Sequence, residues 1–106
     1  MKISEILNSK KVTISFEIFP PKKQEAFDSV KKTALSLSSL KPDFISITYG
    51  AGGSTQTNTS DLAQAVENSG TASLAHLTCV RSTKEQLLQT IQTLKQKNIN
   101  NVLALR

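Results

Sequence analysis

Strand-like and helix-like segments alternate along the chain. Residues 12–19 are rich in β-branched and aromatic side chains, which is typical of a strand. Pro20 and Pro21 end this run, because neither ring can donate a ladder hydrogen bond. Apolar residues then recur three or four positions apart over residues 24–40, which is the spacing of one helix face. These residues are Phe27, Val30, Ala34, Leu37 and Leu40.

The same alternation continues to the end of the sequence. A short helical turn is expected at residues 4–8, a second long helix ends near Gly70, and Ser82 to Glu85 matches a capping box at the start of a third. The further strands are expected at residues 44–49, 72–80 and 101–106. This βαβαβαβ order predicts a parallel sheet joined by right-handed crossovers.

Each predicted strand has one apolar face and one smaller or polar face. The apolar positions are Ile14 and Phe16, Ile45 and Ile47, Ala75 and Leu77, and Leu103 and Leu105; the opposite positions are Ser15 and Glu17, Ser46 and Thr48, His76 and Thr78, and Ala104 and Arg106. A doubly wound sheet carries helices on both faces, and its strands are apolar on both. A single apolar face fits a barrel instead. We therefore predict an α/β fold that forms about the first half of a (β/α)8 TIM barrel.

Four polar residues stand near the carboxyl ends of these strands, namely Glu17, Thr48, His76 and Arg106. Parallel barrel strands end at one rim, and that rim carries the chemistry of such barrels. A single buried carboxylate more often serves a structural ion pair, here with Arg106 or a lysine. Here, however, four strands each carry a polar residue near the carboxyl end, at positions that alternation assigns to the same face of the sheet. This agreement favours a ligand site over a structural ion pair.

Other candidate groups point to less specific roles. His76 is the only histidine, so it cannot complete a multi-histidine metal site, and no metal is expected. The loop at residues 50–55 begins Gly-x-Gly but lacks the third small residue of a dinucleotide fingerprint and the lysine of a P-loop. Cys79 is the single cysteine, which excludes an intrachain disulfide. Alternation along its strand places it on the face that the helices cover, which predicts a packed thiol.

Composition narrows the possible partners. The 106 residues suit one small domain, and 13 basic against 8 acidic residues give a formal charge of +5. The lysine pairs are spread along the chain, which is typical of a solvated surface rather than a nucleic-acid groove. The first residues, Met-Lys-Ile-Ser-Glu, have no long apolar core behind their charge, and nowhere do 18 apolar residues run together. We expect a soluble, cytoplasmic protein that binds neither nucleic acid nor membrane.

Four motifs, taken together, resemble one family. In order and spacing "SFEIFPPK", "DFISITYGAGGST", "AHLTCV" and "NVLALR" are similar to the methylenetetrahydrofolate reductases, flavoproteins of one-carbon metabolism and methionine biosynthesis. The resemblance runs from about Ile3 to Arg106. It implies an eight-stranded barrel that binds FAD at the carboxyl ends of its strands. It also implies reduction of 5,10-methylenetetrahydrofolate to 5-methyltetrahydrofolate with NADH or NADPH, by a parent protein that is a homo-oligomer.

The resemblance also implies roles for individual residues. Glu17 matches the catalytic acid that helps to open the imidazolidine ring of the folate. Such an acid must be protonated near neutral pH, which partial burial over Phe19 favours. Thr48 matches a residue at the nicotinamide and flavin face. The remaining matches are FAD contacts, at Tyr49, Ala51, His76 and Arg106.

The family continues with Gly-Asp after the arginine that Arg106 matches, whereas this sequence ends there. We therefore expect residues 1–106 to be the N-terminal part of a reductase-like barrel domain, truncated after its fourth strand and inactive alone. Two alternatives stay open at this stage. One is a non-catalytic truncated barrel that acts as a binding or regulatory module; the other is a small basic nucleic-acid-binding domain. The sequence does not decide between NADH and NADPH.

Overall fold

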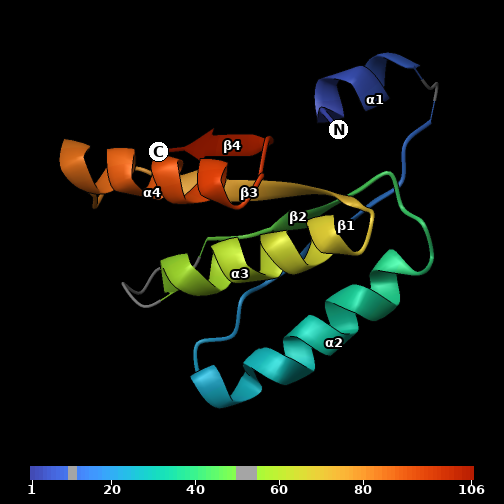
Figure 1. The fold of residues 1–106 in the computed structure, drawn as a ribbon, viewed down its shortest axis with the longest axis horizontal. Helices are drawn as coiled ribbons and strands as arrows, with labels where there is room; N and C mark the ends of the chain where they lie inside the picture. The colour runs from blue at the N-terminus through green and yellow to red at the C-terminus, as the bar shows by residue number, and fades with distance from the viewer. Residues whose placement is uncertain (10–11, 50–54) are drawn as a thin grey trace.

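The structure is a computed structural model that describes residues 1–9, 12–49 and 55–106, the side chains of residues 55–57 excepted. Its elements, in chain order, are α1 (Ile3–Ser9), β1 (Ser15–Ile18), the 3₁₀ helix η1 (Gln24–Ala26), α2 (Phe27–Ser38), β2 (Phe44–Ile47), α3 (Thr55–Asn68), β3 (Ala72–Thr78), α4 (Lys84–Gln96) and β4 (Val102–Leu105). The strands form one parallel sheet in the order β1-β2-β3-β4 (Figure 1). This arrangement confirms the predicted α/β class and matches the first half of a (β/α)8 barrel.

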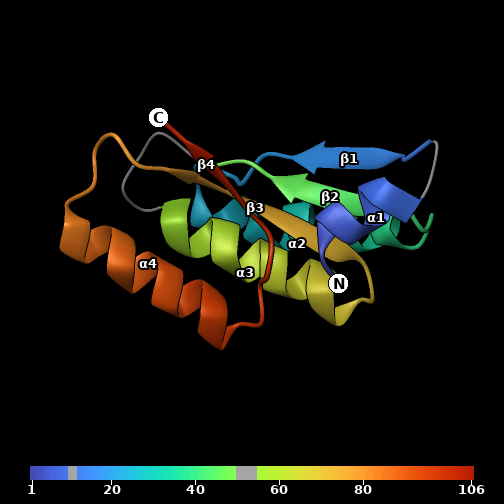
Figure 2. The same cartoon turned by 90° about the horizontal axis from the view of Figure 1, so that it is seen from above.

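One face of the sheet packs against α2, α3 and α4, as Figure 2 shows from above. The strands contribute Ile18, Ile45, Ile47 and Ala75 to this core, with Phe16 packed against it; the helices and the segment after α4 contribute Ala34, Leu62, Ala63, Val66, Leu94 and Ile99. The predicted apolar faces are therefore confirmed at Phe16, Ile45, Ile47 and Ala75, and Leu77 is buried as well, whereas Ile14 precedes β1 and is 61% exposed. Burial of this continuous apolar layer is the main force that holds the helices on the sheet.

The short helix α1 lies on the other face of the sheet, at its N-terminal end. Ile3 and Ile6 pack with Ala72, against Phe44 and Leu74. The Asn101 side chain fixes this helix, because its Oδ1 accepts from the Ile3 amide at 2.9 Å and its Nδ2 donates to the Met1 carbonyl at 3.0 Å. The amino end of the inner face is thereby covered.

The register of β4 corrects one prediction. His76 pairs with Leu103 and Thr78 with Leu105, so both leucines lie on the face of His76. The sequence reading placed them on the helix-covered face and was wrong. The reason is that β4 reads Val-Leu-Ala-Leu, which is apolar at every position and so contains no alternation that could identify a face.

The cap of α4 also differs from the prediction by one residue. Thr83 is the N-cap, its hydroxyl accepts from the Gln86 amide at 3.2 Å, and its own amide donates to Gln86 Oε1 at 2.9 Å. The capping box is therefore formed by Thr83 and Gln86, not by Ser82 and Glu85. The sequence satisfies the motif in both registers, so the motif alone could not choose.

None of the helices in the described part of the chain has the length and apolar content needed to cross a bilayer.

Candidate functional site

The inner face of the sheet, opposite α2, α3 and α4, carries polar side chains toward the carboxyl ends of its strands. Glu17 pairs with Ser46, and Ser46 pairs with Leu74, so these positions share one face with His76, two residues beyond Leu74. The Thr48 amide donates to the Ile18 carbonyl at 2.9 Å, which extends the ladder past β2. Alternation then places Thr48 on the same face as Glu17.

Glu17 and His76 are brought together from β1 and β3. Glu17 Oε1 lies 3.9 Å from His76 Nε2, and the small, buried Ser46 occupies the strand between them. This distance is too long for a hydrogen bond. The carboxylate side chain is 52% exposed and the imidazole only 10%. An accessible carboxyl group beside a largely buried imidazole can exchange protons with a ligand at this end of the sheet.

Phe19 does not form the buried floor that the sequence predicted beneath Glu17. Its side chain is 69% exposed. The apolar surface on this face comes instead from Leu103 and Leu105, which the register of β4 places beside His76 and Thr78. Both leucines are 40% exposed, so the site has an open apolar flank next to its polar pair.

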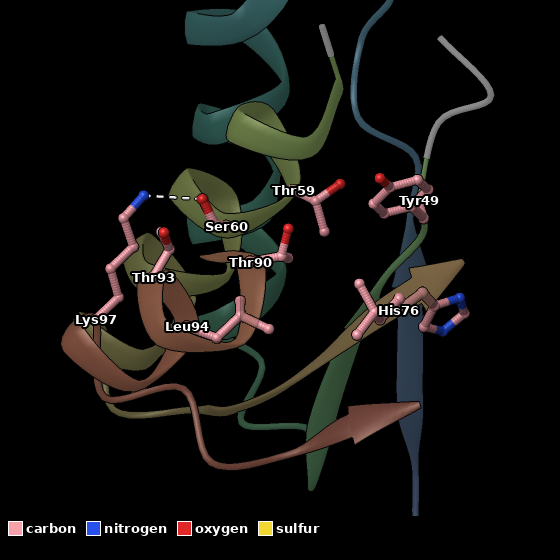
Figure 3. A pocket seen from close by; sticks show the side chains of 9 residues that line it. Tyr49, Thr59, Ser60, His76, Thr90, Thr93, Leu94 and Lys97 are labelled. Carbon is pink, nitrogen blue, oxygen red and sulfur yellow. Dashed lines mark hydrogen bonds between the residues drawn. The ribbon is translucent and has the colours of Figure 1, made fainter. Parts of the chain in front are cut away.

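Tyr49 lies on the helix-covered side of the sheet. Figure 3 shows its ring turned toward Thr59, whereas the His76 ring points away from α3 and α4. Tyr49 lines a cavity of about 130 Å³ whose wall includes Ser60, Leu77, Thr93 and Lys97. The structure therefore does not bring Tyr49 to the face that carries Glu17, because consecutive residues of an extended segment point to opposite sides.

Arg106 and Ala51 complete the set of predicted site residues. Arg106 is exposed and follows β4 directly. Since Leu105 shares the face of Glu17 and His76, continued alternation directs Arg106 to the opposite face. The register of β4 therefore does not support the expected gathering of Arg106 with Glu17, and the role of Arg106 stays a prediction. Ala51 lies outside the described residues.

A polar turn of α3 was missed by sequence reasoning. Asn58, Thr59 and Ser60 are all buried. The signal was available, because Thr59 is in phase with the apolar stripe that continues at Leu62 and Val66. A polar residue at such a position indicates a specific hydrogen-bond partner, since an unpaired buried hydroxyl destabilises the fold.

Among the residues that the structure describes, no group of three or more histidine, cysteine, aspartate or glutamate side chains is arranged to hold a metal ion.

The chain is similar to known proteins over nearly all of its length. The family model described as methylenetetrahydrofolate reductase matches residues 2–106. A probable methylenetetrahydrofolate reductase (NADH) from Oryza sativa subsp. japonica is 37% identical over 106 residues, which is 99% of this chain and 18% of the relative. The 5,10-methylenetetrahydrofolate reductase of Buchnera aphidicola is 36% identical over 99% of this chain and 36% of its own length. That of Pectobacterium carotovorum is 34% identical over 91% of the chain and 33% of its own. The chain thus spans only between 18% and 36% of these relatives.

Proposed function

The chain belongs to the methylenetetrahydrofolate reductase family, and we propose that its full-length parent reduces 5,10-methylenetetrahydrofolate to 5-methyltetrahydrofolate. Residues 1–106 are then the N-terminal part of the barrel domain, with its first four strands. The single observation that carries the proposal is the pair of Glu17 and His76 at the carboxyl end of a parallel sheet, in a chain that matches the family throughout. That is the end at which (β/α) barrels carry out their chemistry.

Glu17 is the proposed general acid. Its carboxyl group donates a proton to a ring nitrogen of the folate imidazolidine, the carbon–nitrogen bond breaks, and the iminium ion that results accepts hydride at its methylene carbon. The half-exposed position of Glu17 supports this role, because a proton donor has to reach its ligand. His76 lies against the carboxylate and helps to orient it.

A bound FAD would supply the hydride chemistry that links the nicotinamide donor to the folate. The inner face fits a flat ring system, because Leu103 and Leu105 supply exposed apolar surface beside the imidazole of His76. We propose Thr48 and His76 as contacts on this face. Tyr49, Ala51 and Arg106 are proposed contacts on family resemblance alone.

NADH is the first donor to test, since it appears in the names of plant relatives. We also propose a cytoplasmic, homo-oligomeric parent.

The decisive experiment is Glu17→Gln in the full-length parent, with the two half-reactions followed separately by stopped-flow absorbance. Loss of the acid should slow folate reduction by about a hundredfold or more, whereas flavin reduction by NADH should change little. Glu25→Gln, on the exposed η1, removes the same charge away from the site and serves as the control. Equal losses in both half-reactions would refute the proposed role, and a wild-type parent without folate reduction would favour the non-catalytic module.

Residues 1–106 alone are proposed to be inactive and to bind FAD weakly, because they supply only part of the rim. A flavin fluorescence titration should give a dissociation constant above about 1 μM. Tighter binding, or oxidation of NADH by this chain alone, would contradict the proposal.

A further inference from the structure

Three consecutive polar residues of α3 are buried where this helix meets the ends of the strands. Asn58, Thr59 and Ser60 are 5%, 3% and 5% exposed. Apolar side chains of similar size would fill this space without the cost of removing polar groups from water. Buried polar groups stabilise one particular arrangement of their hydrogen-bond partners. The partners of this turn therefore indicate which segments it holds in place.

Thr59 and Asn58 both contact the backbone of strand exits. The Thr59 hydroxyl donates to the Thr48 carbonyl at 3.0 Å. The Thr48 amide in turn donates to the carbonyl of Ile18, the residue after Glu17. A chain of hydrogen bonds therefore runs from α3 through the exit of β2 to the exit of β1. Asn58 Nδ2 reaches the Pro21 carbonyl, farther along the β1 exit, at a longer 3.5 Å.

Ser60, in the same turn, faces a different neighbour. Its hydroxyl accepts from Lys97 Nζ at 2.8 Å, and Lys97 also forms an ion pair with Asp61. These contacts join α3 to the C-terminal end of α4 (Figure 3). Two polar residues of the buried turn thus contact the strands that carry the site, and the third contacts the neighbouring helix. Ser60 therefore serves as a matched control for Asn58 and Thr59.

We infer that Thr59 and Asn58 are positioning residues for the reductase site, Thr59 for Thr48 and Asn58 for the strand exit that follows Glu17. This inference rests on the proposed function, which places Thr48 at the nicotinamide and flavin face and makes Glu17 the folate acid. Neither residue touches the reacting atoms. Each fixes a backbone carbonyl after a strand, and displacements of about 1 Å at such points are enough to slow an enzyme substantially.

The first test is Thr59→Val in the full-length parent, since valine keeps the shape and removes the hydroxyl. Flavin reduction by NADH should slow by about tenfold, and Thr59→Ser, which restores the hydroxyl, should recover most of the rate. A second readout is independent of activity. Amide hydrogen exchange over residues 44–49 of the flavin-free parent should become faster in Thr59→Val than in the wild type or Thr59→Ser.

The second test separates the two half-reactions. Asn58→Leu removes the amide donor and should slow folate reduction by about tenfold, with a smaller effect on flavin reduction by NADH. Ser60→Ala, equally buried in the same turn, should leave both rates within about twofold of the wild type. A merely structural turn would instead give all three variants the same loss in both half-reactions.

Unchanged amide exchange over residues 44–49 in Thr59→Val would overturn the inference, as would losses matched by Ser60→Ala. If Thr59→Val does not fold, Asn58→Leu against Ser60→Ala decides the question alone. A wild-type parent that lacks both half-reactions would refute the proposed function, whereas an active wild type with unaffected Thr59→Val and Asn58→Leu would refute this inference only.

Discussion

Glu67 illustrates how one polar side chain can secure a strand from the helix above it. Its Oε1 accepts from both the amide and the hydroxyl of Ser73, at 2.9 and 3.0 Å, and Ser73 is fully buried near the start of β3. Glu67→Ala would leave these two donors without that partner, so we expect the free energy of unfolding of the parent to fall by about 1–3 kcal/mol. Urea unfolding measures it. Glu67→Gln keeps an acceptor oxygen and should lose less; equal losses would contradict the expectation.

Glu17 and His76 could be predicted as neighbours because each stands on a strand whose opposite face is clearly apolar. Thr59 could not, although it is in phase with Leu62 and Val66. A periodicity pattern identifies which face of a helix is buried. It does not show which backbone carbonyl a buried hydroxyl will contact, and the role of the hydroxyl depends on that partner. That carbonyl belongs to Thr48, and only the packed structure brings the two together.

The start of α4 offers a test at the level of one element. Thr83→Ala removes the hydroxyl that accepts from the Gln86 amide, so we expect the free energy of unfolding to fall by about 1 kcal/mol. Ser82→Ala lies one residue outside the cap and should change it by no more than about 0.5 kcal/mol. Urea unfolding of both variants is the measurement. The opposite order of effects would mean that the Ser82 and Glu85 register caps the helix in solution.

Two elements show where local sequence patterns stop being informative. The faces of β4 are set by its pairing with β3, and an all-apolar strand contains no trace of that register. The position of α1 depends on Asn101, whose side chain contacts Met1 and Ile3 at the far end of the sequence. The apolar residues of such a short helix predict that it packs against another surface, but they do not identify that surface.

At the scale of the whole molecule, the order of the sheet was the most predictable feature. Parallel strands linked by helices take right-handed crossovers, and short connections make consecutive strands neighbours, so the order β1-β2-β3-β4 follows from the alternation of elements. The same order makes β1 and β4 the edge strands of the described sheet. Leu103 and Leu105 are partly exposed on β4, beside the open inner face.

Free edges with exposed leucines lead us to expect that residues 1–106, as an isolated chain, self-associate. An unpaired parallel edge offers a row of hydrogen-bonding groups to a second copy, and a charge on such an edge opposes pairing. Sedimentation velocity over a range of concentrations should show a mass that rises with concentration, and Leu105→Lys should reduce that rise. Leu88→Lys adds the same charge at an exposed leucine of α4, away from the edge, and should have little effect. A monomer at every concentration, with a sharp melting transition that is independent of concentration, would contradict the expectation. Equal effects of the two lysine variants would show that the association depends on net charge rather than on the edge of β4.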